Sequence, residues 1–277
     1  MKTAANTFRP WCPIALLCGL SFTLTTQAEL KPMDDAALEE TVGQAYIKMD
    51  SYQDVDSNQI SRITFGQTVK IQANADSLTL GNGGINGAGV ADINATNFSL
   101  GYIDTTSNTI VPFEFTNPYF EWATDATNNV TGFRIGFEDA KGVLQMDLSS
   151  FSGNIGMTIN GEAASLFSGA SGTQTNQRAT YIGTSSGSCT DGTDCVSLSN
   201  IQSLSVADSD SSGTADFFLA FQTNGMNWNT SAGTQATTRG FFMNVPTDNT
   251  LTISDVNSGT AGLAVEFIDR GVGRWNN

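Results

Sequence analysis

Histidine is absent from this 277-residue sequence, and lysine and arginine together number 12 against 27 aspartate and glutamate residues. Histidine is the usual general base near neutral pH and a common zinc ligand, so its absence excludes the most common catalytic and zinc-binding arrangements. Each phosphate contact needs a lysine or arginine, so the charge balance disfavours DNA, RNA and anionic lipid surfaces as partners. We expect no enzyme here and no nucleic-acid-binding protein.

Long apolar runs are scarce as well. The mostly apolar stretch Ile14 to Leu24 is shorter than the about 20 residues that a membrane-spanning helix needs. Lys2 and Arg9 precede it, and a small residue, Ala28, follows it, which is typical of a cleaved export signal. We expect a signal peptide over residues 1–28, no transmembrane span after cleavage, and a location at the cell surface, outside the cell or in the periplasm. A retained anchor and acylation at Cys18 are the alternatives.

Cysteine is rare in the remaining 249 residues, whose net charge is about −17. Cys12 and Cys18 leave with the signal, so Cys189 and Cys195 form one even pair in a polar loop. An exported pair at this spacing predicts a disulfide, which would stabilise so short a loop by only about 2 kcal/mol. A zinc site would need three or four cysteine or histidine ligands.

A short acidic segment, residues 29–47, follows the signal. Asp34 and Asp35 suit a helix N-terminus, and Gly43 can end the helix. Ala37, Leu38 and Val42 recur at helical spacing. We expect one short amphipathic helix over residues 34–42.

From residue 48 to residue 277 the apolar residues mostly alternate, as they do in half-buried strands. Runs 217–221 and 241–245 are apolar in both phases and should be central strands. Asn-Gly pairs, such as Asn160-Gly161, indicate tight hairpin turns. These features predict a single all-β domain, an antiparallel sandwich or jelly-roll-like fold, with an irregular β-solenoid as the alternative. The Gly/Ser/Thr-rich stretch near 165–195 predicts a long surface loop; a division there into two β halves is the other reading.

One motif resembles a calcium loop, because alternating oxygen side chains and a glycine precede an apolar run. Its candidate ligands are the side chains of Asp208, Asp210, Ser212 and Asp216 and the carbonyl of Thr214. A plain solvated hairpin is the competing interpretation. Leu219 stands where an EF-hand has a bidentate glutamate, which argues against that motif. No cofactor is required by the sequence, and calcium is the one candidate ligand.

Three further patterns could carry chemistry. A pair of carboxylates could serve a glycosidase, but solvated strand faces are the default interpretation in so acidic a chain. The carboxylates on or beside expected strands are Glu114, Glu121, Glu138, Asp147 and Glu266. The stretch 183–187 matches the letters of a nucleophile elbow without a base or a strand-to-helix setting. Aromatic clusters at 117–122 and 226–228 could bind sugars, although core packing is the usual role of such residues.

The N-terminal cassette resembles the mature start of the Fil-type pilus-system proteins of proteobacteria. The matching residues are Asp34 to Leu38 and Gly43 to Ala45, and the segments 117–119 and 132–137 also look similar to that family. The resemblance implies an exported, surface or pilus-associated protein and transfers no catalytic residues. We therefore expect a structural or adhesion component whose partners are other surface or pilus components or a glycan. A calcium-dependent binding module and a carboxylate-based glycosidase are the alternatives.

Overall fold

The computed structural model describes residues 46–83, 89, 91–104, 106–184, 188–207 and 212–258. The expected signal 1–28 and the helix expected over 34–42 lie outside these ranges. The described part is almost entirely β-structure, which confirms the predicted fold class.

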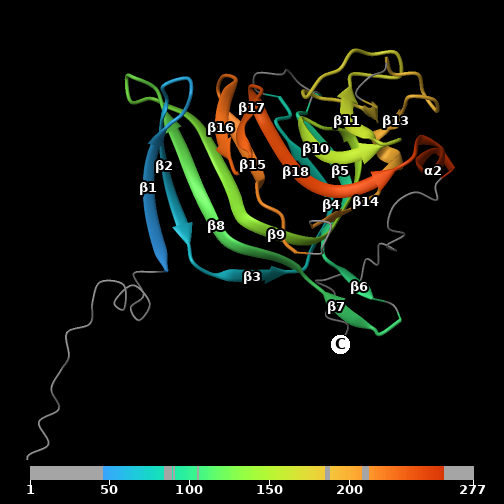
Figure 1. Ribbon diagram of the computed structural model, residues 1–277, viewed down its shortest axis with the longest axis horizontal. Coiled ribbons are helices and arrows are strands. Elements are labelled where there is room, and N and C mark those ends of the chain that lie inside the picture. Colours follow the sequence, from blue (N-terminus) through green and yellow to red (C-terminus); the bar gives the residue numbers. More distant parts are fainter. Residues whose placement is uncertain are drawn as a thin grey trace, which may run out of the picture.

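The elements follow the chain in the order shown by the colours of Figure 1. They are β1 (Ile47–Gln53), β2 (Gln59–Phe65), β3 (Thr68–Ile71), β4 (Ala73–Leu80), β5 (Ile93–Leu100), β6 (Tyr102–Asp104), β7 (Thr109–Val111), β8 (Phe113–Thr124), β9 (Val130–Ser150), β10 (Gly153–Ile159), β11 (Glu162–Phe167), β12 (Tyr181–Thr184), β13 (Cys195–Ser197), η2 (Leu198–Asn200), β14 (Ser203–Val206), β15 (Phe217–Gln222), β16 (Met226–Thr230), β17 (Gly233–Thr237), β18 (Gly240–Leu251) and α2 (Ile253–Ser258).

Fourteen of the described strands form one sheet. Its main path runs β1-β2-β8-β9-β15-β18-β10-β11-β12-β13, while β3, β4, β5 and β14 join it from the side. The runs predicted as central strands, 217–221 and 241–245, lie in β15 and β18 near the middle of this path, as expected. All neighbours are antiparallel except β10 and β18, which pair in parallel. The sheet is therefore mixed rather than purely antiparallel, because β10 and β18 are far apart in the sequence and no hairpin joins them.

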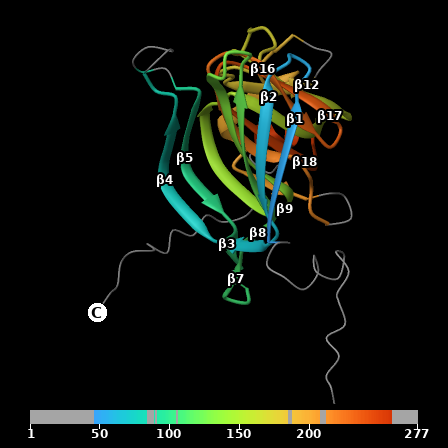
Figure 2. The same ribbon diagram turned by 90° about the vertical axis from the view of Figure 1, so that its left-hand side faces the viewer.

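Strand β9 carries the chain from one layer to the other. Its first part pairs with β8 and β15, and its last part pairs with β5 and β14. Gly142 marks the change with a φ of 141°, and a Cβ there would lie 2.9 Å from the Cα of Phe113. Figure 2 shows β4 and β5 standing apart from β1 and β2 on the other side of the bend. The result is a sandwich-like fold.

The main core lies where these layers meet. It includes fully buried Ile93 from β5, Phe113 from β8 and Ile159 from β10, and α2 closes one end with Ile253 and Val256. A second, smaller core cluster lies where the β16–β17 hairpin covers the sheet; it includes Ile60, Phe218, Trp228 and Phe242. The two clusters lie on opposite faces of β15, since Phe217 belongs to the main core and Phe218 to the smaller cluster.

The surface loop expected near 165–195 is interrupted by strands β11, β12 and β13, while residues 168–180 and 188–194 lie between strands. Strand β11 ends at Phe167, β12 runs through the segment, and β13 begins at Cys195. Phe167, Ile182 and Cys195 are buried. Each of these apolar side chains is buried in a core cluster, and a few such contacts suffice to hold the strands in place. The Gly/Ser/Thr-rich residues between them therefore did not prevent strand pairing.

Candidate functional site

Four charged residues stand side by side across the first strands of the main path. The register pairs Asp50 of β1 with Arg62 of β2, Arg62 with Glu121 of β8, and Glu121 with Arg134 of β9. Residues directly opposite each other on antiparallel strands share a face, so the charges alternate in sign along one row. Lys48 also contacts Asp50, with 2.9 Å between Nζ and Oδ2.

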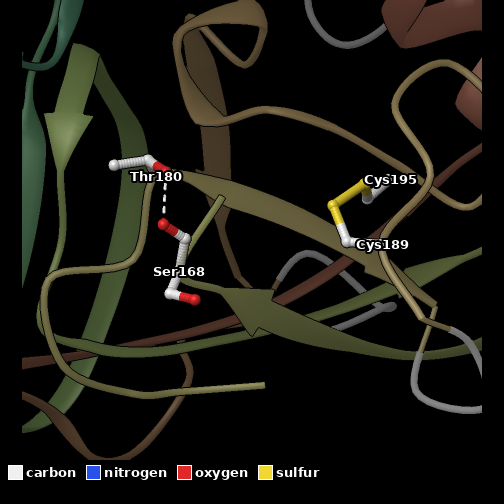
Figure 3. The surroundings of a disulfide bond; sticks show 4 residues. All are labelled: Ser168, Thr180, Cys189 and Cys195. Atoms are coloured by element: carbon white, nitrogen blue, oxygen red, sulfur yellow. Dashed lines mark hydrogen bonds between the residues drawn. A yellow bond between two sulfur atoms is a disulfide. The ribbon is translucent and has the colours of Figure 1, made fainter. Parts of the chain in front are cut away.

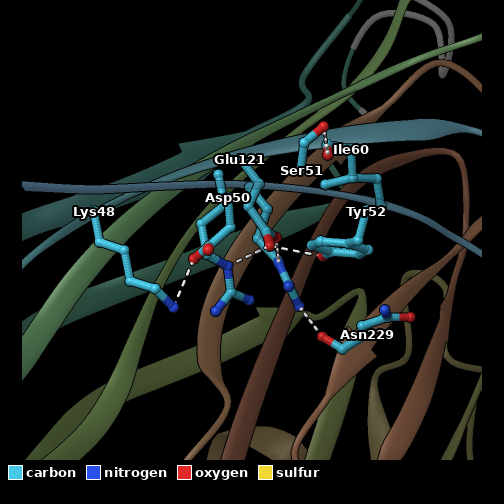
Figure 4. Close-up of polar contacts among 9 residues, drawn as sticks. Lys48, Asp50, Ser51, Tyr52, Ile60, Glu121 and Asn229 are labelled. Carbon is cyan, nitrogen blue, oxygen red and sulfur yellow. Dashed lines mark hydrogen bonds and ion pairs between the residues drawn. The ribbon is translucent and has the colours of Figure 1, made fainter.

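Glu121 is the centre of this row, and its side chain is fully buried. Its Oε1 accepts hydrogen bonds from the Tyr52 hydroxyl and the Arg62 Nε, both at 2.7 Å. Its Oε2 accepts a hydrogen bond from the Arg134 Nε. Figure 4 shows the Tyr52 hydroxyl directed at the Glu121 carboxylate. Both oxygens of a buried carboxylate are therefore held by donors from three other strands.

Arg134 is fully buried too. Its Nη1 donates to the carbonyl of Asn229 at 2.9 Å, which ties β9 to the β16–β17 hairpin. Its Nη2 has no hydrogen-bond partner, but the guanidinium lies 4.9 Å from the ring centroids of both Phe218 and Trp228. Aromatic ring faces attract a desolvated cation, which gives this arginine favourable contacts on its unbonded side.

The cluster changes the ionisation of its own members. Burial, supported by the charge of Glu121, raises the pKa of Tyr52 above its usual range. Burial likewise raises the pKa of Tyr119, whose ring lies 4.0 Å from the Arg62 guanidinium, to about 12. Burial lowers the pKa of Arg62, but the charge and hydrogen bond of Glu121, together with Tyr119 and Tyr52, outweigh that effect and the net shift is upward. Arg62 is thus charged and both phenols are neutral at physiological pH.

The other face of these strands carries no charged residue in the two rows of paired residues next to the cluster row. Side chains alternate along a strand, so the neighbours of each cluster residue point to the other side of the sheet. The register places these residues in two adjacent rows: Met49, Ile63, Phe120, Ile135, Leu219 and Met243; and Ser51, Ser61, Trp122, Phe133, Phe221 and Phe241. We call these twelve residues, together with Phe65, the aromatic face.

Part of the aromatic face is open to solvent in the described structure. Met49 is 71% exposed, Phe120 36%, Phe133 39% and Phe221 42%. Large apolar residues that gather on one exposed surface mark interaction sites more often than single exposed ones do. At strand spacings of about 4.8 Å, the face from β1 to β15 is roughly 19 Å wide.

The rings of the aromatic face form a ladder but not a flat platform. Phe65 meets Phe120 edge to face at 6.0 Å between centroids, with an interplanar angle of 89°. Phe120 and Phe133 lie 6.1 Å apart and are tilted by 35°. A sugar ring stacks on a flat aromatic surface, whereas ridged faces pack by interdigitating side chains, as two sheets do. The rings of the aromatic face therefore present a ridged surface.

The carboxylates considered for a glycosidase are held in separate contacts. Glu114 pairs with Lys70 at 2.7 Å and with Lys141 at 3.5 Å. Asn117 donates to Glu138 at 2.9 Å, and Asn97 donates to Asp147 at 2.7 Å. Glu266 lies outside the described residues. The structure therefore gives each of these described carboxylates a local partner within the fold.

The calcium-like motif is described only in part, since Asp208 and Asp210 lie outside the described residues. Thr214 forms a bridge with Ala140, in which its carbonyl accepts the Ala140 N–H at 2.9 Å. The Asp216 carboxylate accepts hydrogen bonds from the Ser231 N–H and hydroxyl. Ser212 also has an interaction within the chain. Among the described residues, no group of three or more His, Cys, Asp or Glu side chains could hold a metal ion.

Cys189 and Cys195 form a disulfide, as the sequence predicts (Figure 3). The bond packs beside Phe167 and Tyr181, so it fastens the polar loop to β11 and β12. Of the stretch 183–187, the residues Gly183 and Thr184 belong to β12, and the other three lie outside the described ranges.

The two aromatic clusters divide between the faces of the sheet. Tyr119, Met226 and Trp228 are buried, as the core-packing interpretation holds. Phe120 and Trp122, in contrast, belong to the aromatic face. Sequence reasoning missed Arg62 and Arg134 as members of any site; the signal available was that each stands in an alternating run among apolar residues.

Fold and site together define the class: an all-β, sandwich-like protein that has a buried ion cluster on one sheet face and a charge-free aromatic surface on the other. No helix of the described part is long and apolar enough to cross a membrane. Comparison with known proteins gives no match, whether to a family model, a curated protein or a solved structure.

Proposed function

We propose that this chain is an exported structural or adhesion-type surface protein that makes its contacts through the aromatic face. The observation that carries the proposal is the exposure of Met49, Phe120, Phe133 and Phe221 on a face without charge, in a chain whose formal net charge is −15. Interfaces use aromatic and methionine side chains as anchors and keep charge out of their centre.

Two further features support export and a non-catalytic role. Disulfides persist in oxidising compartments outside the cytoplasm, and the Cys189–Cys195 pair is bonded. Glu121, a fully buried carboxylate, accepts hydrogen bonds from three donors within the fold. The resemblance of the N-terminal cassette to pilus-system proteins supports association with a pilus.

The test combines localisation with a change confined to the face. In cells that express the tagged chain, we expect it in the periplasmic or surface fraction and incorporated into surface assemblies. The double variant Phe120→Ser/Phe133→Ser should be exported in equal amount but lost from those assemblies by tenfold or more, the scale of one or two lost anchors. Recovery of the chain only from the cytosol, or normal incorporation of the double variant, would refute the proposal.

Ile110→Ser provides the matched control. Ile110 is an equally apolar residue, 61% exposed, on β7 of the separate β6–β7 hairpin. Its replacement lowers surface hydrophobicity without touching the aromatic face. Incorporation of this variant at the normal level separates a specific effect of the face from a general effect of solubility.

A further inference from the structure

The first strand of the sheet has an open outer edge in the described structure. Strand β1 ends the strand order, and β2 is the partner on its inner side. It is seven residues long, contains no proline or bulge, and bears exposed Ile47 and Met49. Edge strands are usually blunted by prolines, bulges or unpaired charges, because an open edge pairs with other strands. The one lysine of β1, Lys48, is neutralised by Asp50.

The hydrogen bonds of β1 show which of its peptide groups face outward. The Gly66 N–H donates to the Tyr46 carbonyl at 2.8 Å, and the Asp54 N–H donates to the Asn58 carbonyl at 3.0 Å. In an antiparallel pair every second residue faces the partner, so the even-numbered residues face β2. The peptide groups of Ile47, Met49, Ser51 and Gln53 therefore point to the open edge.

From these observations we infer that two copies of this chain associate through antiparallel pairing of β1 with β1 of the second copy, with Met49 opposite Met49. This register places outward peptide groups against outward peptide groups. It also places Lys48 opposite Asp50 of the other copy, twice by symmetry. The inference rests on the proposed function and deepens it, because it names a second copy as the first partner in assembly.

The alternative self-pairings are less favourable. A register centred on Asp50 would place two aspartates directly opposite each other, which is destabilising, and the Asp50 peptide group faces β2. A register centred on Ser51 would place Asp50 opposite Tyr52 and Lys48 opposite Asp54, which lies past the end of the strand and whose carboxylate already accepts the Asp56 and Asn58 N–H groups. Charge complementarity thus favours the register centred on Met49. It also favours a second copy of this chain, rather than an uncharged strand, as the pairing partner.

Pairing in this way joins two aromatic faces into one. Ile47 and Met49 of β1 pair with Phe65 and Ile63 of β2, so all four side chains lie on the same face of the sheet. Across the two-fold axis the two Met49 side chains would meet, and the charge-free surface would double in width to roughly 40 Å at about 4.8 Å per strand. A C2 arrangement of this kind is the commonest symmetry among soluble oligomers.

Cysteine scanning of the full chain tests the register. Residues opposite each other in a hydrogen-bonded pair have Cα atoms about 5.5 Å apart, within the range that a disulfide bridges. We expect Met49→Cys to form a disulfide-linked dimer on mild oxidation. Ser51→Cys, also exposed and on the same face, should stay monomeric under denaturing conditions, since its copies would lie roughly 14 Å apart along the strand. Linkage through Ser51→Cys instead would overturn the register.

Sedimentation velocity of the same chain tests the dimer itself. We expect a concentration-dependent dimer that Met49→Pro abolishes with an unchanged melting temperature, because the Met49 N–H points outward and proline is tolerated at such edge positions. Lys48→Asp should weaken dimerisation about tenfold by opposing two acids, whereas Lys48→Arg should preserve it. A wild-type chain that remains monomeric, including one whose edge is covered by its own termini, would overturn the inference. Sedimentation does not measure localisation, so a monomeric chain would refute the dimer without refuting the proposed function.

Discussion

At the scale of single residues, Glu121 depends on partners from three strands. Burial deprives a carboxylate of hydration, and this is offset only when its partners are charged and well placed. Arg62 and Arg134 meet that condition, and the neutral Tyr52 hydroxyl adds a hydrogen bond to the carboxylate. The sequence could not single out Glu121, because Glu114 and Glu138 stand on the same strands with similar neighbours. What distinguishes Glu121 is the register that brings two arginines beside it, and register is a property of paired strands.

Glu121→Gln is expected to lower the free energy of unfolding by about 3–5 kcal/mol, since it leaves two buried or half-buried arginines without their counter-charge. Glu114→Gln, which removes the exposed pair with Lys70, should cost less than about 1 kcal/mol. Denaturant unfolding followed by circular dichroism measures both values. Equal costs for the two variants would show that the buried cluster contributes no more than a surface ion pair.

At the scale of elements, alternation identified most strands but not their limits. The Asn160-Gly161 turn could be predicted from the sequence, because an Asn-Gly pair tolerates positive φ angles; the two residues have φ angles of 52° and 82°. The β1–β2 hairpin was missed, since its turn at Asp54 to Asn58 has no Asn-Gly pair and is held by side-chain bonds to Asp54 instead. The segment 139–142 lies within β9, where Gly142 bends the strand without ending it.

The β16–β17 hairpin covers the ion cluster, and Trp228 is its anchor. Trp228 is fully buried against Arg134, and its ring N–H donates to the Gln222 side chain at 3.4 Å. Trp228→Ala should therefore cost about 3–5 kcal/mol, the usual cost of an aromatic core truncation. The control Thr234→Ala changes an exposed residue of the same hairpin and should cost less than about 0.5 kcal/mol. Thermal and denaturant unfolding compare the two, and a small cost for Trp228→Ala would mean that the hairpin is only loosely attached.

At the scale of the whole molecule, the sequence predicts an acidic all-β fold but not which sheet face is covered. Strands β8, β9 and β15 carry apolar residues in both phases, such as Tyr119 and Phe120 side by side, so either face could have been core. The path of β9 and the β16–β17 hairpin that closes over Arg134 decide which face of the sheet is covered. Both are long-range arrangements, so the ion cluster and the aromatic face were not predictable as sites.

The same burial makes the stability of the molecule sensitive to alkali. Tyr119 is 2% exposed, and burial raises its pKa to about 12, whereas an unfolded tyrosine ionises near its ordinary value of about 10. The folded state holds the proton more tightly, so this contribution is full below pH 10, declines between pH 10 and 12, and is lost as pH rises past 12. Two pKa units correspond to about 3 kcal/mol.

Tyr119→Phe should remove this part of the alkaline destabilisation while leaving stability at pH 7 within about 1 kcal/mol, because the phenylalanine ring still faces Arg62 and Arg134. Free energies of unfolding measured between pH 7 and pH 12 give the two slopes. The wild-type curve should fall more steeply above pH 10 than the variant curve, and the remaining fall in the variant should shrink further when Tyr52→Phe is added, since burial also raises the pKa of Tyr52. Parallel curves for the wild type and Tyr119→Phe would show that the Tyr119 hydroxyl reaches solvent before unfolding, and that the ion cluster opens without loss of the fold.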